Sequence, residues 1–377
     1  MKNNYTCILH SHTENGWKSI QAKNPIEIFK GPLSKLDNFV KKHSFLNHPI
    51  IGYFSYDLGY QLHNIKKIAK NDLNLPDIYL LAFEQKNIRP FKANNTIAPV
   101  SESKHNSKSF NPTITKTQYS HAYNKIKHHI KEGDIYQINL THRLEATTTK
   151  NPLNLFHKII ETNPVDHLAY IEGPNFEILS ASPERFIKIH NNHIETCPIK
   201  GTRPRHKNLQ KDQKLKKELL ESKKEAAELN MITDLLRNDL GKVCTTNSVK
   251  VEGHRLIQAC PTVWHTYSHI TGKLKQKITP IQALISMLPG GSITGCPKKR
   301  AMEIIDKLEP TTRSVYTGVI GIIHPNQDLD FSIAIRTIIK KGDKLYLQIG
   351  GGIVLDSTST AEYQETLDKA KSFTKIL

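Results

Sequence analysis

The chain has 377 residues, enough for one large domain or two ordinary ones, and its 37% hydrophobic and 23% charged residues are typical of globular proteins. The net charge of +18 would suit a nucleic-acid-binding protein. However, the basic residues are spread out, and Lys207–Lys224 alternates with acidic residues like a solvated helix face. We therefore expect no nucleic-acid partner, although a positive field would help attract a small dianionic substrate.

The cysteines and the N-terminus indicate a reducing compartment. The five cysteines are scattered without a CxxC pair, which argues against a disulfide framework or a zinc site. Met1–His12 lacks the apolar region of a signal peptide, and no run of 18 apolar residues occurs. We expect a soluble, cytoplasmic protein with no membrane partner.

Short apolar runs in the first part of the chain, Ile50–Tyr56 and Ile78–Phe83, predict buried strands. Lys92–Thr115 is rich in Asn, Ser, Lys, Pro and Thr and predicts a connector. After it, apolar residues from Tyr119 to Ile130 recur at helical spacing, and Gly133 ends this helix. Asp134–Leu144 is then predicted to be a strand.

The second half of the chain predicts further helices and strands. A helix is expected from about Ser222 to Leu240, ending at Gly241, and another from Pro297 to Pro310. The last helix begins at about Ser359. Three strands are expected between these last two helices, at Ser314–Ile323, Phe331–Ile338 and Lys344–Ile349. This succession predicts an α+β fold with antiparallel sheets.

Two of the predicted helices carry acidic pairs at a spacing of three, which places each pair on one helix face. The four carboxylates are those of Glu225, Glu228, Glu362 and Glu365. Together they could hold a hard cation through oxygen ligands. Alternatively, Glu225 and Glu362 are the fourth residues of capping boxes begun by Ser222 and Ser359, which would explain them without a metal.

Two glycine-rich stretches would allow the backbone to approach a ligand closely. Pro289–Gly295 leads into a predicted helix N-terminus, where free amides suit a phosphate or carboxylate. It is not a Walker A loop, because Cys296 stands where that motif needs lysine. A tight turn explains the glycines equally well. Gly350–Gly352 permits either a close approach or a simple bend.

Lys200 lies in the segment PIKGTRPR, between prolines and beside Arg203 and Arg205. Neighbouring positive charge would disfavour its ammonium form, which is one way to obtain a nucleophilic lysine. A surface lysine in a loop is the alternative. Glu184 and His265 are unremarkable when each is considered alone.

Taken together, the segments resemble the chorismate-binding family, which includes the large subunits of anthranilate and aminodeoxychorismate synthases and the isochorismate and salicylate synthases. The matching blocks are IIGYFSYDLGY (50–60), GDIYQINL (133–140), SPERF (182–186), PIKGTRPR (198–205), KEAAELNMITDLLRNDLGKV (224–243), LPGGSITGCPKKRAMEIIDKLEP (288–310), YTGVIG (316–321), SIAIRT (332–337) and GGGIVLDSTSTAEYQETLDKA (350–370). They imply one large α+β unit of two packed, mostly antiparallel sheets with outer helices. Residues 1–110 would form a shortened N-terminal region, and residues 115–377 the catalytic core.

The resemblance implies that chorismate and Mg²⁺ bind in a deep cleft. Glu228 and Glu365 match direct Mg²⁺ ligands, and Glu225 and Glu362 match ligands that act through water. Further positions match substrate-binding residues: Tyr316, Arg336, Gly350, Gly351, Gly352 and Lys369. Glu184 matches the general acid and base, and Ser292 matches a loop hydroxyl near the ring. His265 matches the family histidine, although Trp264 and Thr266 beside it depart from the usual sequence.

Position 200 distinguishes the members of the family. The resemblance associates alanine here with anthranilate synthases and lysine with aminodeoxychorismate synthases, in which Lys200 would form a covalent intermediate on the way to p-aminobenzoate and folate. Gln137 stands where isochorismate and salicylate synthases carry lysine. The chain is therefore expected to aminate chorismate at C4, with anthranilate synthase as the alternative. No cysteine lies in a Gly-x-Cys-x-Gly turn, so ammonia is expected from a separate glutaminase subunit.

Overall fold

The computed structural model describes residues 4–93 and 107–377, and its strands form two large antiparallel sheets. The first sheet contains, from edge to edge, β16 (Gly295–Cys296), β8 (Gln137–Thr148), β20 (Lys344–Ile353), β19 (Thr337–Lys341), β10 (Glu177–Ser182), β9 (His167–Glu172), β1 (Thr6–His10), β2 (Ile20–Lys23) and β6 (Ile88–Pro90), with β7 (Ser107–Pro112) paired to β8. The second sheet contains β13 (Ile199–Pro204), β15 (Val263–Lys273), β12 (His193–Thr196), β11 (Arg185–His190), β18 (Leu329–Ile333), β17 (Val319–Ile323), β4 (Ile50–Phe54), β5 (Ile78–Ala82) and β3 (Glu27–Phe29), with β14 (Lys250–Ala259) paired to β15.

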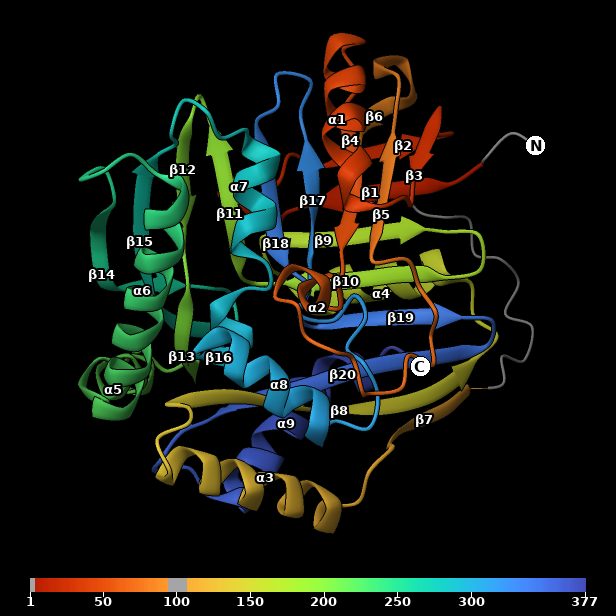
Figure 1. Ribbon diagram of the computed structural model, residues 1–377. Coiled ribbons are helices and arrows are strands. Elements are labelled where there is room, and N and C mark those ends of the chain that lie inside the picture. The colour runs from red at the N-terminus through yellow and green to blue at the C-terminus, as the bar shows by residue number, and fades with distance from the viewer. Residues whose placement is uncertain (1–3, 94–106) are drawn as a thin grey trace.

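Helices surround the two sheets, whose strands cross steeply in Figure 1. They are α1 (Leu36–Phe45), α2 (Leu58–Leu62), α3 (Lys116–Lys131), α4 (Pro152–Thr162), α5 (Leu209–Glu221), α6 (Lys223–Val243), α7 (Pro280–Met287), α8 (Lys298–Leu308) and α9 (Ser359–Thr374), with short 3-10 turns η1 (Leu33–Lys35), η2 (Gln85–Asn87) and η3 (Gly291–Ile293). The predicted α+β class with two packed antiparallel sheets is confirmed. None of the helices in the described ranges is long and apolar enough to cross a membrane.

The N-terminal strands complete both sheets. β1 pairs with β9 in the first sheet, while β4 pairs with β17 in the second. Apolar side chains from these strands meet in one cluster between the sheets, where Leu9 and Tyr53 are fully buried. Trp17 joins this cluster, and its indole nitrogen donates to the carbonyl of Asp330 at 3.2 Å. Cys7, Leu9 and Trp17 are therefore part of the core that joins the two sheets.

One predicted strand proves to be two. Phe331–Ile338 was expected to be continuous, but β18 ends at Ile333 in the second sheet and β19 begins at Thr337 in the first. The chain crosses between the sheets at Ile335 and Arg336, and Arg336 adopts a φ of 51°, which is rare for a residue with a side chain. Alternation of apolar residues continues on both sides of the break, so the pattern alone did not reveal the change of sheet.

Other boundaries also differ from the prediction. Part of the expected connector, Ser107–Pro112, is strand β7, while residues 94–106 lie outside the described ranges. The strand expected at Asp134 begins at Gln137 and continues to Thr148, and the one expected at Ser314 begins at Val319. Gly241 does not end α6, which continues to Val243, because no neighbouring atom crowds this glycine and the helix simply passes through it.

The two capping boxes have different outcomes. At the start of α6, the Ser222 side chain accepts a hydrogen bond from the amide of Glu225, which is half of the expected capping box, while the Glu225 side chain pairs with Arg203. At the start of α9 the N-cap is Thr358, and no side chain caps the helix. The Ser359 box is therefore wrong, and Glu362 instead accepts a hydrogen bond from the Ser357 hydroxyl at 2.7 Å.

Arg313 is the largest fully buried side chain in the described residues. It donates to both carboxylate oxygens of Glu309, at 2.9 and 2.6 Å, and to the carbonyls of Ile293, at 2.9 Å, and Asn139, at 2.6 Å. Its guanidinium carbon lies 4.7 Å from the centre of the Tyr56 ring. The turn containing η3 and strand β8 are thus joined through one buried cation.

We predict that Arg313→Met lowers the free energy of unfolding by about 3–5 kcal/mol, because it leaves the Glu309 carboxylate buried and unpaired. Urea titration followed by circular dichroism measures this change. Lys158→Met is the control, since its ion pair with Glu161 is exposed and such pairs contribute about 0–1 kcal/mol. The double variant Arg313→Met/Glu309→Gln should lose less stability than the single variant, because the buried negative charge is also removed. Equal losses in Arg313→Met and Lys158→Met would show that the buried ion pair contributes no more than an exposed one.

Candidate active site

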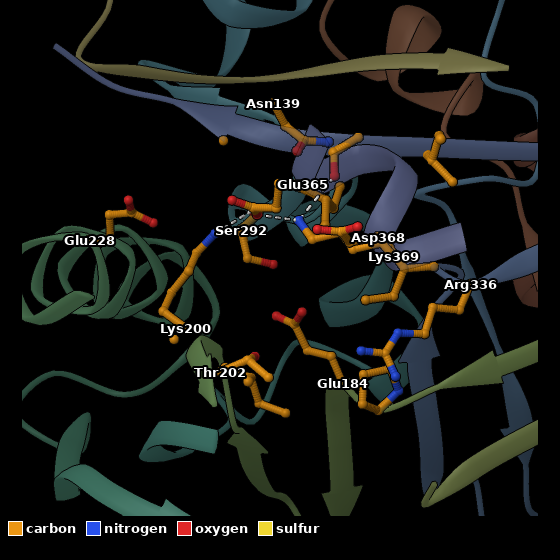
Figure 2. A pocket seen from close by; sticks show the side chains of 18 of the residues that line it. Asn139, Glu184, Lys200, Thr202, Glu228, Ser292, Arg336, Glu365, Asp368 and Lys369 are labelled. Atoms are coloured by element: carbon orange, nitrogen blue, oxygen red, sulfur yellow. Dashed lines mark hydrogen bonds and ion pairs between the residues drawn. The ribbon is translucent and has the colours of Figure 1, made fainter. Parts of the chain in front are cut away.

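A cavity of about 510 Å³ lies where the two sheets meet α6 and α9. Every residue predicted to bind substrate, metal or the reacting atoms lines it, with the exception of Gly351. These lining residues are Glu184, Lys200, Glu225, Glu228, His265, Ser292, Tyr316, Arg336, Gly350, Gly352, Glu362, Glu365 and Lys369. Figure 2 shows charged side chains from several of these elements pointing into one space.

The fold brings these residues together from both sheets. β13 carries Lys200 at the edge of the second sheet. α6 packs against the same sheet, where the Thr233 hydroxyl donates a hydrogen bond to the Ser268 hydroxyl at 2.9 Å. α9 packs on the first sheet, where Thr366 hydrogen-bonds His142 at 2.8 Å. The crossing between β18 and β19 places Arg336 between these two walls. The cavity is therefore the gap between one helix-covered sheet and the other.

Lys200 lies among carboxylates in this cavity, and the two arginines that follow it in the sequence are both paired. Its Nζ is 3.4 Å from the carbonyl of Ser292. Arg203 pairs with Glu225 at 3.3 Å, while Arg205 pairs with Asp212 at 3.0 Å. Each of these guanidinium groups is thus compensated by its own carboxylate, unlike the free positive charge expected beside Lys200 from the sequence.

Glu184 is 6% exposed and shares the cavity with Lys200. Burial raises the pKa of its carboxyl group above the ordinary value, and the positive charge of Lys200 opposes this shift. A carboxyl group with a raised pKa retains its proton closer to neutral pH. Glu184 is therefore suited to donate a proton to a departing oxygen.

His265 is buried beside the same cavity. Burial lowers its pKa to about 4, with a further contribution from the positive charge of Arg336. Its Nδ1 lies 2.9 Å from the Thr202 hydroxyl oxygen and 3.4 Å from the Gly201 carbonyl, on the paired strand β13. The imidazole is therefore neutral near pH 7.

The two unusual neighbours of His265 both support β13. The Trp264 indole nitrogen donates to Asp212 at 3.1 Å, and Arg205 stacks 4.1 Å from the centre of the Trp264 ring. The Thr266 hydroxyl donates to the carbonyl of Lys200. Both residues thus make contacts that help to hold the Lys200 strand in place.

Arg336 has no hydrogen bond or ion pair to its side chain among the described residues. Burial lowers the pKa of its guanidinium below the ordinary value, because no carboxylate compensates the charge. Tyr316, whose pKa burial raises, lines the same cavity. An uncompensated, two-pronged cation of this kind is suited to bind a carboxylate that enters from outside.

The four carboxylates of α6 and α9 face one another across the cavity, but cations separate them. Glu225 pairs with Arg203, and Glu365 pairs with Lys369 at 2.8 Å. Among the residues that the structure describes, no three His, Cys, Asp or Glu side chains are already close enough to hold a metal ion. A metal would therefore require some of these ion pairs to open.

The surroundings of the carboxylates nevertheless fit a small hard cation. A Cβ at Gly351 would lie 3.3 Å from Glu362 Oε2 and 3.9 Å from Glu365 Oε1, so the absence of a side chain there leaves room beside both oxygens. Carboxylate oxygens are the ligands that Mg²⁺ prefers. Gly350–Gly352 form part of the regular strand β20, opposite Asn139–Thr141, so this run is not a bend.

Comparison with known proteins identifies the family. A sequence model described as chorismate binding enzyme matches residues 12–375. The chain belongs to the chorismate-binding family.

Relatives named as two different synthases are about equally similar in sequence to this chain. Anthranilate synthase component 1 of Acetivibrio thermocellus is 34% identical over 96% of this chain and 82% of the relative. Aminodeoxychorismate synthase component 1 of Escherichia coli strain K12 is 37% identical over 87% of this chain and 76% of the relative. The solved anthranilate synthase component I of Streptococcus pneumoniae superposes with a TM-score of 0.82 at 29% identity, covering 94% and 92% of the two chains. Overall similarity therefore does not choose between the two names.

Some lining residues of this family member were not singled out from the sequence. Asn139, Thr202, Lys224, Gln348 and Asp368 also line the cavity. Thr202 and Lys224 lie within the matching blocks, whereas Gln348 is an ordinary strand residue that only the pairing of β20 with β8 brings to the site. The glycine-rich loop reaches the cavity through Ser292 and Ile293, and no α8 residue in the described chain lines it.

We predict that His265 stays neutral at pH 5. In the folded protein the pKa of His265 is lowered to about 4, whereas in the unfolded chain it is about 6.5. Between these two pH values the unfolded chain therefore binds a proton more readily than the folded protein does. The free energy of unfolding should decrease as pH falls through this window. An NMR titration of the imidazole carbons, assigned with a His265→Gln variant, measures the change directly. A midpoint at or above pH 6 would contradict the proposed burial.

Proposed function

We propose that this chorismate-binding protein is the large subunit of an aminodeoxychorismate synthase and places an amino group on C4 of chorismate. The observation that carries this proposal is Lys200, which lies in the cavity together with the buried acid Glu184 (Figure 2). A lysine amine is a nucleophile that alanine, associated with anthranilate synthases at this position, would not supply. The names of three similar relatives include this activity.

The charges of the cavity suit a dianion accompanied by a divalent cation. Arg336 offers an uncompensated guanidinium to one carboxylate of chorismate. Glu228 and Glu365 would hold Mg²⁺ directly, and Glu225 and Glu362 through water. When bound, the metal would neutralise and orient the carboxylate on the chorismate ring. Tyr316, Lys369 and the backbone of Gly350–Gly352 would complete the substrate site.

The proposed reaction consists of two allylic displacements. The unprotonated amine of Lys200 attacks C2, the two conjugated ring double bonds each shift by one position, and the C4–oxygen bond breaks. Glu184 gives its proton to the departing hydroxyl, which leaves as water. Ammonia then attacks C4 as both double bonds shift back and the bond from C2 to Lys200 breaks. The new ammonium group returns a proton to Glu184, so that both residues are restored.

The remaining polar residues position the reacting groups. The Ser292 carbonyl contacts Lys200 Nζ, and the Ser292 hydroxyl would lie near the substrate ring. Neutral His265, held by Thr202, would act as a hydrogen-bonding group and not as a fixed cation. The closed environment around Glu184 limits access of water, which would otherwise compete with ammonia for C4.

Anthranilate synthase remains the second candidate, because a relative with that name covers most of this chain at 34% identity. In that reaction ammonia attacks C2 directly, and no lysine is required at position 200. Identification of the product formed from chorismate, Mg²⁺ and ammonium distinguishes the two reactions.

We predict that Lys200→Ala abolishes formation of aminodeoxychorismate, because ammonia loses the covalent intermediate that directs it to C4. Any residual amination should occur at C2. Liquid chromatography with mass spectrometry identifies the product. Incubation with chorismate and no ammonia should add a chorismate-derived mass to the wild type and none to the variant. A normal rate of C4 amination by Lys200→Ala would disprove the mechanism.

We also predict that the purified chain uses ammonium salts but not glutamine. The glutaminases that would serve this family carry a nucleophilic cysteine in a Gly-x-Cys-x-Gly turn, and none of the cysteines of this chain lies in such a turn. Activity with ammonium should rise with pH, since only the unprotonated amine is a nucleophile, and addition of a glutaminase subunit should confer use of glutamine. Release of glutamate from glutamine by the chain alone, measured by a coupled assay, would refute this arrangement.

A further inference from the structure

Lys224 contacts a carboxylate from each of the two acidic helices. It lies in the first turn of α6, and its Nζ is 3.9 Å from Glu228 Oε1 on the same helix. The same Nζ is 3.5 Å from Glu362 Oε1 on α9. Because α6 packs on the second sheet and α9 on the first, this ammonium group bridges the two walls of the cavity.

Lys224 is the cation in direct contact with both carboxylates, while the charge of Lys200 also acts on Glu228 from further away. In the described chain, Glu228 and Glu362 have no other ion-pair partner within 4.0 Å. Glu362 is 3% exposed, so an unpaired negative charge would be costly there. The other two carboxylates of the cluster are compensated separately, Glu225 by Arg203 and Glu365 by Lys369.

The ammonium group of Lys224 and a divalent cation would compete for the same oxygens. Two cations held within a few ångströms of each other repel strongly in a partly buried site. Glu362 is fixed by the Ser357 hydroxyl and by burial, so it cannot move away. The Lys224 side chain is 49% exposed and has a flexible stem, so it can turn towards solvent.

We propose that Lys224 is a displaceable counter-cation, which neutralises Glu228 and Glu362 in the metal-free protein and leaves them when a divalent cation binds. This inference rests on the proposed function, in which those carboxylates hold Mg²⁺. The observed affinity for the metal is then the difference between its attraction to the carboxylates and the loss of the two Lys224 contacts. Lys224 keeps α6 and α9 together without metal and makes metal binding weaker than the carboxylates alone would allow.

The test measures binding of Mn²⁺, a spectroscopic substitute for Mg²⁺, to the full chain without chorismate. Loss of the free Mn²⁺ signal in electron paramagnetic resonance gives the dissociation constant. Lys224→Met removes one positive charge next to the bound ion, so its dissociation constant for Mn²⁺ should be roughly tenfold lower than that of the wild type. Lys224→Arg retains the charge and should stay near the wild type. Lys223→Met removes the adjacent exposed charge and is the matched control.

Thermal unfolding provides a second measurement. The metal-free Lys224→Met variant should melt at a lower temperature than Lys223→Met, because Glu228 and Glu362 lose their counter-ion. Saturating Mn²⁺ should then raise the melting temperature of Lys224→Met by more than that of the wild type. This pattern separates a counter-cation from a lysine that only contributes to packing.

The outcomes distinguish this inference from the proposed metal site. If Lys224→Met binds Mn²⁺ no more tightly than Lys223→Met while Glu228→Gln weakens binding, the metal site stands and the role of Lys224 is refuted. If the wild type shows no saturable binding, or Glu228→Gln does not weaken it, the metal site itself fails and the inference fails with it. Tighter binding by Lys224→Met, together with loss of binding by Glu228→Gln, supports both.

Discussion

The buried ion pair between Arg313 and Glu309 joins the segments on which the cavity depends. Arg313 donates to the carbonyls of Ile293 and Asn139, and Glu309 accepts from the amide of Thr141 at 2.9 Å. Ile293 and Asn139 both line the cavity, and Tyr316 follows Arg313 by three residues. A buried guanidinium that hydrogen-bonds all of these groups fixes the distance between the η3 turn and β8 more firmly than apolar packing would, because apolar side chains can shift past one another. The position of Ser292 relative to Lys200 follows from this spacing.

Most charged side chains of the cavity are paired with one another. The carboxylates of α6 and α9 are matched by Arg203, Lys224 and Lys369, whereas Arg336 has no carboxylate of its own. A site that is nearly neutral when empty avoids the large cost of burying unpaired charge. A divalent cation and a dianion together also add no net charge. Binding of the two should therefore be mutually favourable, since either one alone leaves a charge of two uncompensated.

Sequence patterns predicted some parts of this structure well. Residues that act through local chemistry were found because their neighbours in sequence are also their neighbours in space, as with Glu225 and Glu228 on one helix turn. The resemblance of ordered blocks to a known family pointed to further cavity residues, such as Arg336 and Lys369, but not to Asn139, Thr202, Lys224, Gln348 or Asp368. What the sequence did not reveal depends on partners distant in the chain. The break at Arg336 arises from a change of sheet, and the contact of Lys224 with Glu362 arises from the docking of α9 against α6.

The same dependence on distant partners explains why overall identity does not settle the reaction. In the proposed mechanism, the acidic helices and Arg336 serve the binding of chorismate whichever carbon is aminated, so similarity over the whole chain does not report on the choice of carbon. The choice of carbon depends on which nucleophile reaches C2 first. A lysine at position 200 is already inside the cavity, whereas ammonia must diffuse in, so the tethered amine has the advantage of high effective concentration. In the proposed reaction, Lys200 occupies C2 and leaves C4 as the position for ammonia, so that one side chain on an edge strand would redirect the amination.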